Sequence, residues 1–297
     1  MTDVLANSGL VIVDKPAHMT SHDVVAKLRR AFGTRKVGHA GTLDPMATGV
    51  LVAGIERGTK FLAHLVAETK TYQATIRLGM STSTDDAEGE VIAQTNAGQV
   101  TEAEIRSEIV KLTGDIMQKP SAVSAIKING KRAHTLVREG VDVDIPARPV
   151  TVHRFEVFDI RSSQEFIDLD VEVLCSSGTY IRSLARDLGQ ALAVGGHLTA
   201  LRRTAVGPFT LEHAHTLEAL AESPKLSLTL DQALATSFPV LEVSEDEAAA
   251  LAMGKWLEPR GLKGVHAAVT ADGQSIALVK EKGKRLSTVF VARPSTL

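Results

Sequence analysis

The pattern of apolar and polar positions near the start of the chain predicts a strand, a turn and a helix. Residues 9–15 are apolar and rich in Val and Ile, and Pro16 follows them, which is typical of a strand that ends in a turn. Thr20 or Ser21 can cap the amphipathic helix that comes next, and Gly33 ends it. The apolar face of this helix comprises Val24, Val25, Leu28 and Phe32.

The middle of the chain alternates helical and strand-like periods. Residues 56–66 have helical character, whereas residues 70–78 alternate polar and apolar side chains, as a half-buried strand does. Thr101 and Glu104 form a capping box, which predicts a helix behind them. The side chains that this helix should turn toward the core are Ile105, Ile109, Val110 and Leu112.

Two further strands and a helix are predicted in the region that follows. Residues 149–160 and 166–175 are expected to pair across a polar turn. The second strand then continues into a helix capped near Ser177 or Thr179. The inward side chains of that helix are Ile181, Leu184, Leu188 and Leu192.

A polar stretch before Val240 marks the predicted edge of a first domain. Beyond this edge, the pattern predicts a capped helix over residues 244–254 and strands over residues 275–280 and 287–292. These three elements describe a small α+β module. We therefore expect one domain of residues 1–237 and a second of residues 238–297.

Composition is that of an ordinary globular protein. Of 297 residues, 44% are hydrophobic and 23% are charged, which allows a well-buried core in about two domains. No apolar run approaches the roughly 20 residues of a membrane helix, and the first ten residues show no secretory signal. Cys175 is the only cysteine, which excludes an intrachain disulfide and a multi-cysteine zinc site. We therefore expect a cytoplasmic protein in a reducing compartment.

The formal net charge of −2 means that any contact with a polyanion has to be local. Basic residues do gather in three runs, while acidic residues gather elsewhere in the chain. One such run is usually a solvated face, but three together are consistent with a surface that binds nucleic acid. The runs lie within residues 27–36, 119–138 and 280–285.

The stretch from Val37 to Leu51 concentrates two glycines, a histidine and an Asp-Pro pair. Pro45 fixes its own φ and biases Asp44 away from the helical region, so the carboxylate is presented from a stiff loop. Such a carboxylate suits a reactive group, but it can also simply close an Asx turn before the proline. A phosphate-binding P-loop is excluded because His39 stands where that loop needs Lys.

The same stretch resembles the catalytic loop of the TruB-type tRNA pseudouridine synthases, which has the pattern G-H-x-G-T-L-D-P-x-A-x-G-x-L. Every fixed position is matched, by Gly38, His39, Gly41, Thr42, Leu43, Asp44, Pro45, Ala47, Gly49 and Leu51. In that family the aspartate is catalytic, and the target is the uridine at position 55 of the tRNA T-loop. The resemblance therefore implies that Asp44 is the catalytic residue.

Three more segments resemble the family. Residues 175–189 match the pattern C-x-x-G-T-Y-I-R-x-L-x-x-D-x-G, and residues 198–209 match L-x-x-L-R-R-x-x-V-G-x-F. Residues 82–89 match T-x-T-x-D-x-x-G, but an acidic surface turn has the same composition, and we assign this loop no chemical role. Cys175 has no base nearby in sequence, so we expect a buried structural thiol rather than a nucleophile.

The basic segment that begins at Gln118 resembles the insertion with which the family grips RNA, and here it spans about residues 118–148. The resemblance implies that Lys127 and Arg138 contact RNA. The segment departs from the family pattern at Ser121, where a second proline is usual, and at His134, where a tyrosine is usual.

The remaining predicted site residues also follow from the resemblance. Tyr72 is expected to stack on the target uracil, and Tyr180 to orient the pocket; these are the only tyrosines in the chain. Arg182 is the expected cationic partner of the catalytic carboxylate, because a nearby cation keeps a carboxylate ionised. From sequence alone, an ordinary arginine on a helix surface is the favoured interpretation of Arg182.

Three more residues complete the predicted site. His39 should occupy the space that the flipped base vacates, with a catalytic acid–base role as the less favoured alternative. Leu201 should form an apolar wall of the pocket, with a plain core position as the alternative. Lys15 should supply a cation at a strand end near the site.

Together, these features predict an α+β pseudouridine synthase-like catalytic domain with a mixed, mainly antiparallel sheet, followed by a small PUA-like RNA-binding domain. The expected function is isomerisation of a T-loop uridine in tRNA without a metal or other cofactor. The expected partner is the T-arm stem-loop, and neither a membrane nor an obligate protein partner is expected. The alternatives are an RNA-binding or tRNA-folding protein in which catalysis is secondary, and a synthase for another RNA.

Overall fold

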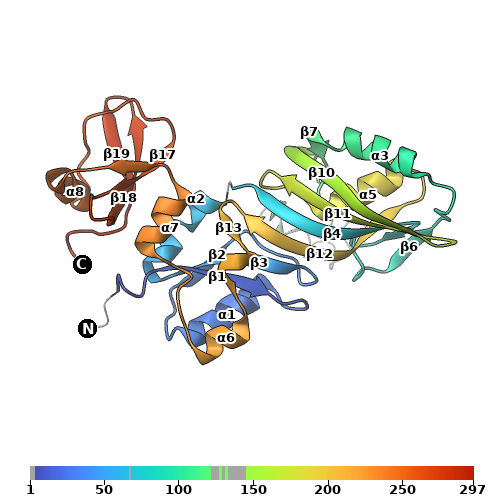
Figure 1. Ribbon diagram of the computed structural model, residues 1–297, viewed down its shortest axis with the longest axis horizontal. Coiled ribbons are helices and arrows are strands. Elements are labelled where there is room, and N and C mark those ends of the chain that lie inside the picture. Colours follow the sequence, from blue (N-terminus) through green and yellow to red (C-terminus); the bar gives the residue numbers. More distant parts are fainter. Residues whose placement is uncertain (1–3, 67, 122–126, 129–130, 133–144) are drawn as a thin grey trace. The chain divides into compact units, whose positions relative to one another are not determined.

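The computed structural model describes residues 4–66, 68–121, 127–128, 131–132 and 145–297. The chain forms two compact units (Figure 1). The first comprises Met1–Pro45, Gly49–Val66 and Val206–Leu297, and the second Met46–Thr48 and Ala67–Ala205. The predicted domains, residues 1–237 and 238–297, do not coincide with these two units, and that division stays a prediction. None of the helices in the described ranges is both long and apolar enough to cross a membrane.

Strand β1 (Gly9–Lys15) is central to the sheet of the first unit. It pairs antiparallel along its whole length with β3 (Thr48–Ile55), and β3 pairs antiparallel with β2 (Val37–Ala40). On the other side of β1 lie β14 (Ala214–His215), which is parallel to it, and β15 (Leu228–Thr229), which is antiparallel. This part of the sheet is mixed and mainly antiparallel, as predicted.

Helix α1 (Ser21–Ala31) begins where the sequence predicts. Thr20 and Asp23 form a capping box, in which the Asp23 amide donates to the Thr20 hydroxyl at 3.1 Å. The predicted apolar positions Val24, Val25 and Leu28 are buried. The helix packs beside α6 (Leu217–Glu222), as Figure 1 shows.

Two segments of the first unit differ from the predictions. Residues 56–66 form a 3₁₀ helix, η1 (Glu56–Lys60), and a single α-helical turn, α2 (Leu62–Leu65), instead of one helix. The polar stretch before Val240 contains helix α7 (Leu230–Ser237), which the sequence pattern did not predict. Earlier in the chain, β13 (Phe209–Thr210) and the 3₁₀ helix η2 (Leu211–His213) come directly before β14.

The C-terminal segment of this unit forms its own four-stranded sheet, in the order β16-β17-β18-β19. Helix α8 was predicted from its capping box, and two of the four strands were predicted from their pattern. Apolar side chains of α8 and of one sheet face form a small core, which includes Leu251, Val279 and Leu286. The elements are β16 (Val240–Glu242), α8 (Glu245–Ala252), β17 (Val265–Val269), β18 (Ser275–Lys282) and β19 (Arg285–Val291).

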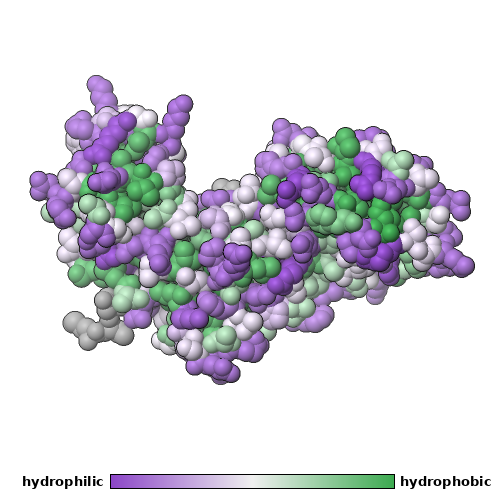
Figure 2. Space-filling model, viewed as in Figure 1, coloured by the Kyte–Doolittle hydropathy of each residue, from purple (hydrophilic) through white to green (hydrophobic). Residues whose placement is uncertain are grey.

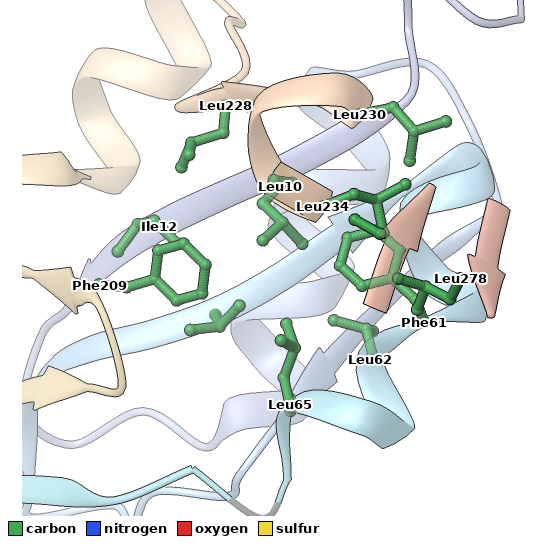
Figure 3. Packing of buried hydrophobic residues seen from close by; sticks show 14 of the residues in the cluster. Leu10, Ile12, Phe61, Leu62, Leu65, Phe209, Leu228, Leu230, Leu234 and Leu278 are labelled. Carbon is green, nitrogen blue, oxygen red and sulfur yellow. The ribbon is translucent and has the colours of Figure 1, made fainter. Parts of the chain in front are cut away.

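A second core cluster joins this small sheet to the rest of the first unit. Figure 3 shows side chains from β1, α2, α7 and β18 meeting in it, among them Phe61, Leu234 and Leu278. Arg57 strengthens the junction, because its Nε donates to the Ala292 carbonyl at 2.8 Å. The C-terminal module is therefore fixed to the end of β3 by apolar packing and hydrogen bonds.

The second unit is built on strands in the order β12-β4-β11-β10-β7. The pairs β4–β11, β11–β10 and β10–β7 are antiparallel. The strands are β4 (Lys70–Leu78), β7 (Gly114–Gln118), β10 (Arg148–Ser162), β11 (Ile167–Cys175) and β12 (Gly196–Val206). Two small hairpins accompany them, β5 (Met80–Thr82) with β6 (Val91–Gln94), and β8 (Lys127–Ile128) with β9 (Lys131–Arg132).

Helices α3 (Glu102–Lys111) and α5 (Ile181–Ala191) pack against each other, with α3 against β10 and α5 against β4. The capping box of α3 is present as predicted. The prediction for Val110 is wrong, because its side chain is 71% exposed. Helix α5 begins at Ile181, after N-cap residue Tyr180, rather than at a cap formed by Ser177 or Thr179.

Candidate active site

The loop that carries Asp44 connects β2 to β3 and is bonded to the start of α1. The amide of Leu43 donates to the hydroxyl of Ser21 at 3.0 Å, and the amide of His18 donates to the carbonyl of Pro45 at 2.8 Å. The backbone is therefore fixed on both sides of Asp44. Gly41 precedes it at a φ of 75°, a left-handed conformation that glycine adopts without strain. The half-buried carboxylate of Asp44 is thus carried by a backbone with little freedom.

Lys15 lies at the end of β1, as predicted, and its side chain is fully buried. Its ammonium donates to the carbonyls of Pro16 at 2.8 Å, Met19 at 2.6 Å and Pro45 at 3.2 Å. These contacts offset part of the cost of burying the charge. Lys15 therefore ties the Asp44 loop to the segment before α1, in addition to placing a cation beside that loop.

His39 lies on β2, and its half-buried ring packs edge-on against His22 of α1 with 5.6 Å between the ring centroids. Lys15, His39 and the Asp44 loop are thus grouped in the first unit around the N-terminal end of α1. The expected entry of His39 into the space left by a flipped base stays a prediction.

In the second unit, the side chain of Gln118 fixes the backbone of Tyr180 at the start of α5. The Tyr180 amide donates to Gln118 Oε1 at 2.8 Å, and Gln118 Nε2 donates back to the Tyr180 carbonyl at 3.1 Å. Gln118 is only 1% exposed and ends β7. Gln118 therefore satisfies the amide of the N-cap residue Tyr180, while no side chain caps the first turn of α5.

Tyr72 and Leu201 are both buried, on the neighbouring strands β4 and β12. Lys70, two positions before Tyr72 on the same face of β4, is buried as well. Desolvation, aided by the nearby charge of Arg203, lowers the pKa of Lys70. This side of β4 therefore combines an aromatic ring with buried positive charge.

Arg182 is buried, so the alternative of a surface arginine is wrong. Its Nη1 lies 3.4 Å from Asp86 Oδ2, and both side chains are only 5% exposed. The same nitrogen donates to the Thr84 carbonyl at 2.9 Å. Asp86 also accepts a hydrogen bond from the amide of Glu88 at 3.1 Å. Arg182 is consequently held in one place by the loop of residues 82–89.

Sequence reasoning did not single out Asp86, because the loop was assigned no chemical role and an acidic surface turn was the alternative. The structure excludes the surface turn at this position, since Asp86 is buried and paired with Arg182. The family pattern at residues 82–89 was the available signal: a fixed aspartate in a polar loop needs a partner, and Arg182 stands at a fixed position of another pattern.

A second ion pair joins Asp85, the residue before Asp86 in the loop, to Arg186, one turn after Arg182 in helix α5. Arg186 Nη1 lies 3.3 Å from Asp85 Oδ2, and Arg186 Nη2 donates to the Lys119 carbonyl at 2.6 Å. Arg186 also contacts Asp187 at 2.8 Å. Burial raises the pKa of Asp85 and of Asp187 despite this cation. The start of the 118–148 segment is thereby tied to the helix that carries Arg182.

Cys175 is buried at the end of β11, which agrees with the expected structural thiol. Burial raises the pKa of the Cys175 thiol to about 11, so the thiol is protonated at neutral pH and is a poor nucleophile.

Of the two RNA contacts predicted in the insertion, Lys127 lies on β8, where its backbone pairs with Arg132, and Arg138 lies outside the described residues. In the part of the chain that the structure describes, no group of three or more His, Cys, Asp or Glu side chains is arranged to hold a metal ion.

Comparison of the chain with known proteins identifies its family. Three family models match successive parts of the chain. They are the TruB family pseudouridylate synthase N-terminal domain at residues 29–181, the tRNA pseudouridylate synthase B C-terminal domain at residues 182–235, and the tRNA pseudouridine synthase II C-terminal model at residues 238–293.

Among curated proteins, the tRNA pseudouridine synthase B of Corynebacterium aurimucosum is 72% identical over 297 residues and covers 100% of both chains. That of Rhodococcus jostii is 61% identical and covers 99% of this chain and 96% of its own.

Among solved structures, the chain is similar to one in a Cbf5-Nop10-Gar1 complex, with a TM-score of 0.76, 26% identity, and coverage of 98% of this chain and 87% of that one. It is also similar to a chain of an H/ACA ribonucleoprotein bound to a substrate RNA containing 2′-deoxyuridine, with a TM-score of 0.74, 25% identity, and coverage of 98% and 86%. The chain belongs to the TruB family of pseudouridine synthases.

Proposed function

We propose that this protein is an isomerase that converts the uridine at position 55 of the tRNA T-loop to pseudouridine, with Asp44 as its catalytic residue. The observation that carries the proposal is the fixed loop around Asp44, which holds the family's catalytic aspartate between two tethered neighbours. Family membership and the names of the relatives support the same activity.

The reaction is a rearrangement within one nucleotide. The bond from N1 of uracil to C1′ of the ribose breaks, the base turns, and a bond from C5 to C1′ forms. The proton on C5 is lost and N1 gains one, so atoms and electrons balance without a redox partner. An ionised Asp44 carboxylate serves as nucleophile or as electrostatic partner, with attack on the sugar and attack on the base both open.

A fixed backbone on both sides of Asp44 matters because the carboxylate must meet one reacting carbon. Correct placement of a reacting group can supply much of a rate enhancement, and displacement by about 1 Å can cost roughly 100-fold. The contacts of Ser21 and Lys15 with this loop therefore act on the reaction through the position of Asp44.

The second unit supplies the residues that are proposed to receive the base. A target inside a folded loop has to be turned outward, and flipped bases are commonly held against aromatic rings. Tyr72 is proposed to stack on the uracil, Tyr180 to orient the pocket and Leu201 to form its apolar wall. Arg182 is proposed to be the cation that keeps the Asp44 carboxylate ionised. From the first unit, His39 is proposed to fill the space that the flipped base leaves in the T-loop.

The RNA partner is proposed to be the T-arm stem-loop of tRNA, with Lys127 and Arg138 as contacts from the insertion. The alternative is an RNA-binding or tRNA-folding protein in which catalysis is secondary. The two proposals differ in turnover: an isomerase acts repeatedly on a bare stem-loop, whereas a folding protein needs only to bind it.

The test is tritium release from a T-arm stem-loop that carries uridine labelled at C5, with the native chain and Asp44→Asn. Asp246→Asn is the matched control, because it makes the same chemical change at an exposed position on α8. We expect release from the native chain and the control, and RNA binding without release from Asp44→Asn. Release that survives Asp44→Asn, once deamidation is excluded, would refute the role of Asp44.

A further inference from the structure

Helix α1 is bonded at both of its ends to the segment that carries His39. At its C-terminal end, Arg29 Nη2 donates to the Val37 carbonyl at 3.2 Å. At its N-terminal end, the Ser21 hydroxyl accepts from the Leu43 amide at 3.0 Å and donates to the Leu43 carbonyl at 3.3 Å. Because His39 lies between Val37 and Leu43, these contacts hold the backbone on both sides of it.

One side chain of α1 also contacts the His39 ring. The imidazole of His22 lies edge-on to it, with 5.6 Å between the ring centroids and 80° between the ring planes. This T-shaped arrangement is one that aromatic rings prefer, and such a contact shifts an equilibrium by roughly twofold to tenfold. The backbone contacts place the residue, whereas the contact with His22 favours one orientation of the ring itself.

His22 is in turn held by the cap of the helix. The Thr20 amide donates to Asp23 Oδ2 at 2.9 Å, and the Asp23 amide donates to the Thr20 hydroxyl at 3.1 Å. His22 stands between these two residues in the first turn, and its side chain is exposed. Figure 2 shows hydrophilic side chains over the lowest part of the first unit, where Figure 1 places α1 and α6. His22 can therefore be replaced without opening the core.

The contacts that fix the Asp44 loop are made by other side chains. The loop is bonded through the hydroxyl of Ser21 and through the ammonium of Lys15, which donates to the Pro45 carbonyl at 3.2 Å. Loss of the His22 ring leaves both of these contacts in place. An effect of His22 on the His39 ring is therefore separable from an effect on the position of Asp44.

We propose that His22 is a positioning residue, which holds the His39 ring in the orientation in which it enters the T-loop. The proposal rests on the proposed function, in which His39 fills the space that the flipped base leaves. A ring that is already oriented loses less conformational freedom when RNA binds, so the complex is tighter. His39 meets the RNA in the ground state and in the transition state alike, and His22 consequently acts on KM and not on kcat.

The test measures the Kd of the full-length chain for a T-arm stem-loop, and the kcat and KM of tritium release from it. The variants are His22→Ala, His22→Phe, His39→Ala and the double alanine variant, each shown to be folded by circular dichroism. The matched control is His153→Ala, which removes an exposed histidine from the second unit.

We expect His22→Ala to raise Kd and KM roughly twofold to tenfold and to leave kcat as it is in the native chain. His22→Phe keeps a ring at this position and should restore most of the affinity. In a chain that already carries His39→Ala, the further change His22→Ala should have no effect on Kd, because His22 acts through His39. The control should match the native chain in all three quantities.

Unchanged Kd and KM in His22→Ala would overturn the proposal, and so would a fall in kcat at constant KM. Equal weakening by His22→Phe and His22→Ala would show that the imidazole contacts RNA directly, and additive effects of the two alanine substitutions would show that His22 does not act through His39; either result overturns the proposal. Absence of tritium release from the native chain would instead refute the proposed function. Release that is intact in the native chain, together with no effect of His22→Ala, refutes only the role of His22.

Discussion

Replacement of Gln118 should separate the backbone position of Tyr180 from the chemistry of its side chain. The amide of Gln118 makes two hydrogen bonds to the Tyr180 backbone, at 2.8 and 3.1 Å, and its side chain is buried. Each bond contributes about 1 kcal/mol, and each partner left unsatisfied adds to the cost. Gln118→Ala should therefore lower the free energy of unfolding by about 2–4 kcal/mol.

The effect on catalysis follows from the same contacts. Without Gln118, the first turn of α5 is free to shift, and both Tyr180 and Arg182 shift with it. A displacement of about 1 Å at these residues should lower kcat for the stem-loop by roughly 10-fold to 100-fold. Gln118→Glu should retain the contact with the Tyr180 amide but lose the donor to its carbonyl, so its kcat should lie between those of the native chain and Gln118→Ala.

Urea unfolding should be followed by circular dichroism, because the only tryptophan lies in the first unit, whereas Gln118 lies in the second. Gln190→Ala is the matched control, since Gln190 is an exposed glutamine on the same helix, α5. Activity is measured by tritium release under conditions in which each variant is fully folded. If Gln118→Ala unfolds within about 0.5 kcal/mol of the native chain and retains its kcat, the assigned role of Gln118 is wrong.

Three further predictions concern buried charges and the thiol. Asp86→Ala leaves the charge of Arg182 buried without Asp86 and should destabilise the chain by about 3–5 kcal/mol in urea unfolding. At pH 7, Asp85→Asn should lower the free energy of unfolding less than Asp86→Ala does. Burial raises the pKa of Asp85, so the stability that Asp85 contributes is lost as pH rises through that pKa. Asparagine does not ionise and therefore removes this loss. Because burial raises its pKa to about 11, Cys175 should resist iodoacetamide at pH 8 in the native chain and react only after unfolding, as mass spectrometry would show.

Local patterns predicted many of the secondary elements. Strands β1 and β4 and the capped helices α1, α3 and α8 follow from side-chain periodicity and from cap residues within a few positions of each other. Helix α7 was missed although Thr229 and Gln232 form a capping box at its start, because the surrounding polar residues were interpreted as a domain edge. Its Leu230 and Leu234 pack into the core cluster of the first unit. Val110 was misplaced because the edge of an amphipathic stripe cannot be located to one residue by periodicity alone.

The candidate site shows the same difference between what local patterns reveal and what long-range contacts determine. Patterns of fixed residues indicated Asp44, Tyr180 and Arg182, since each lies in a dense local motif. They did not indicate which side chains hold them, because those partners are far away along the chain. Gln118 bonds Tyr180 across 62 positions, and Asp86 pairs with an arginine that is nearly a hundred positions later.

Because these long-range partners position the site residues, a chain can carry every residue of a motif and still lack activity when one partner is changed. The carboxylate, the ring and the guanidinium supply the chemistry, but each is positioned by a contact that is formed only when the unit folds. Substitution of Ser21, Gln118 or Asp86 would leave every predicted catalytic and base-binding side chain in the sequence while moving one of them. Loss of activity in such variants, with RNA binding retained, would therefore measure the contribution of position rather than of chemical identity.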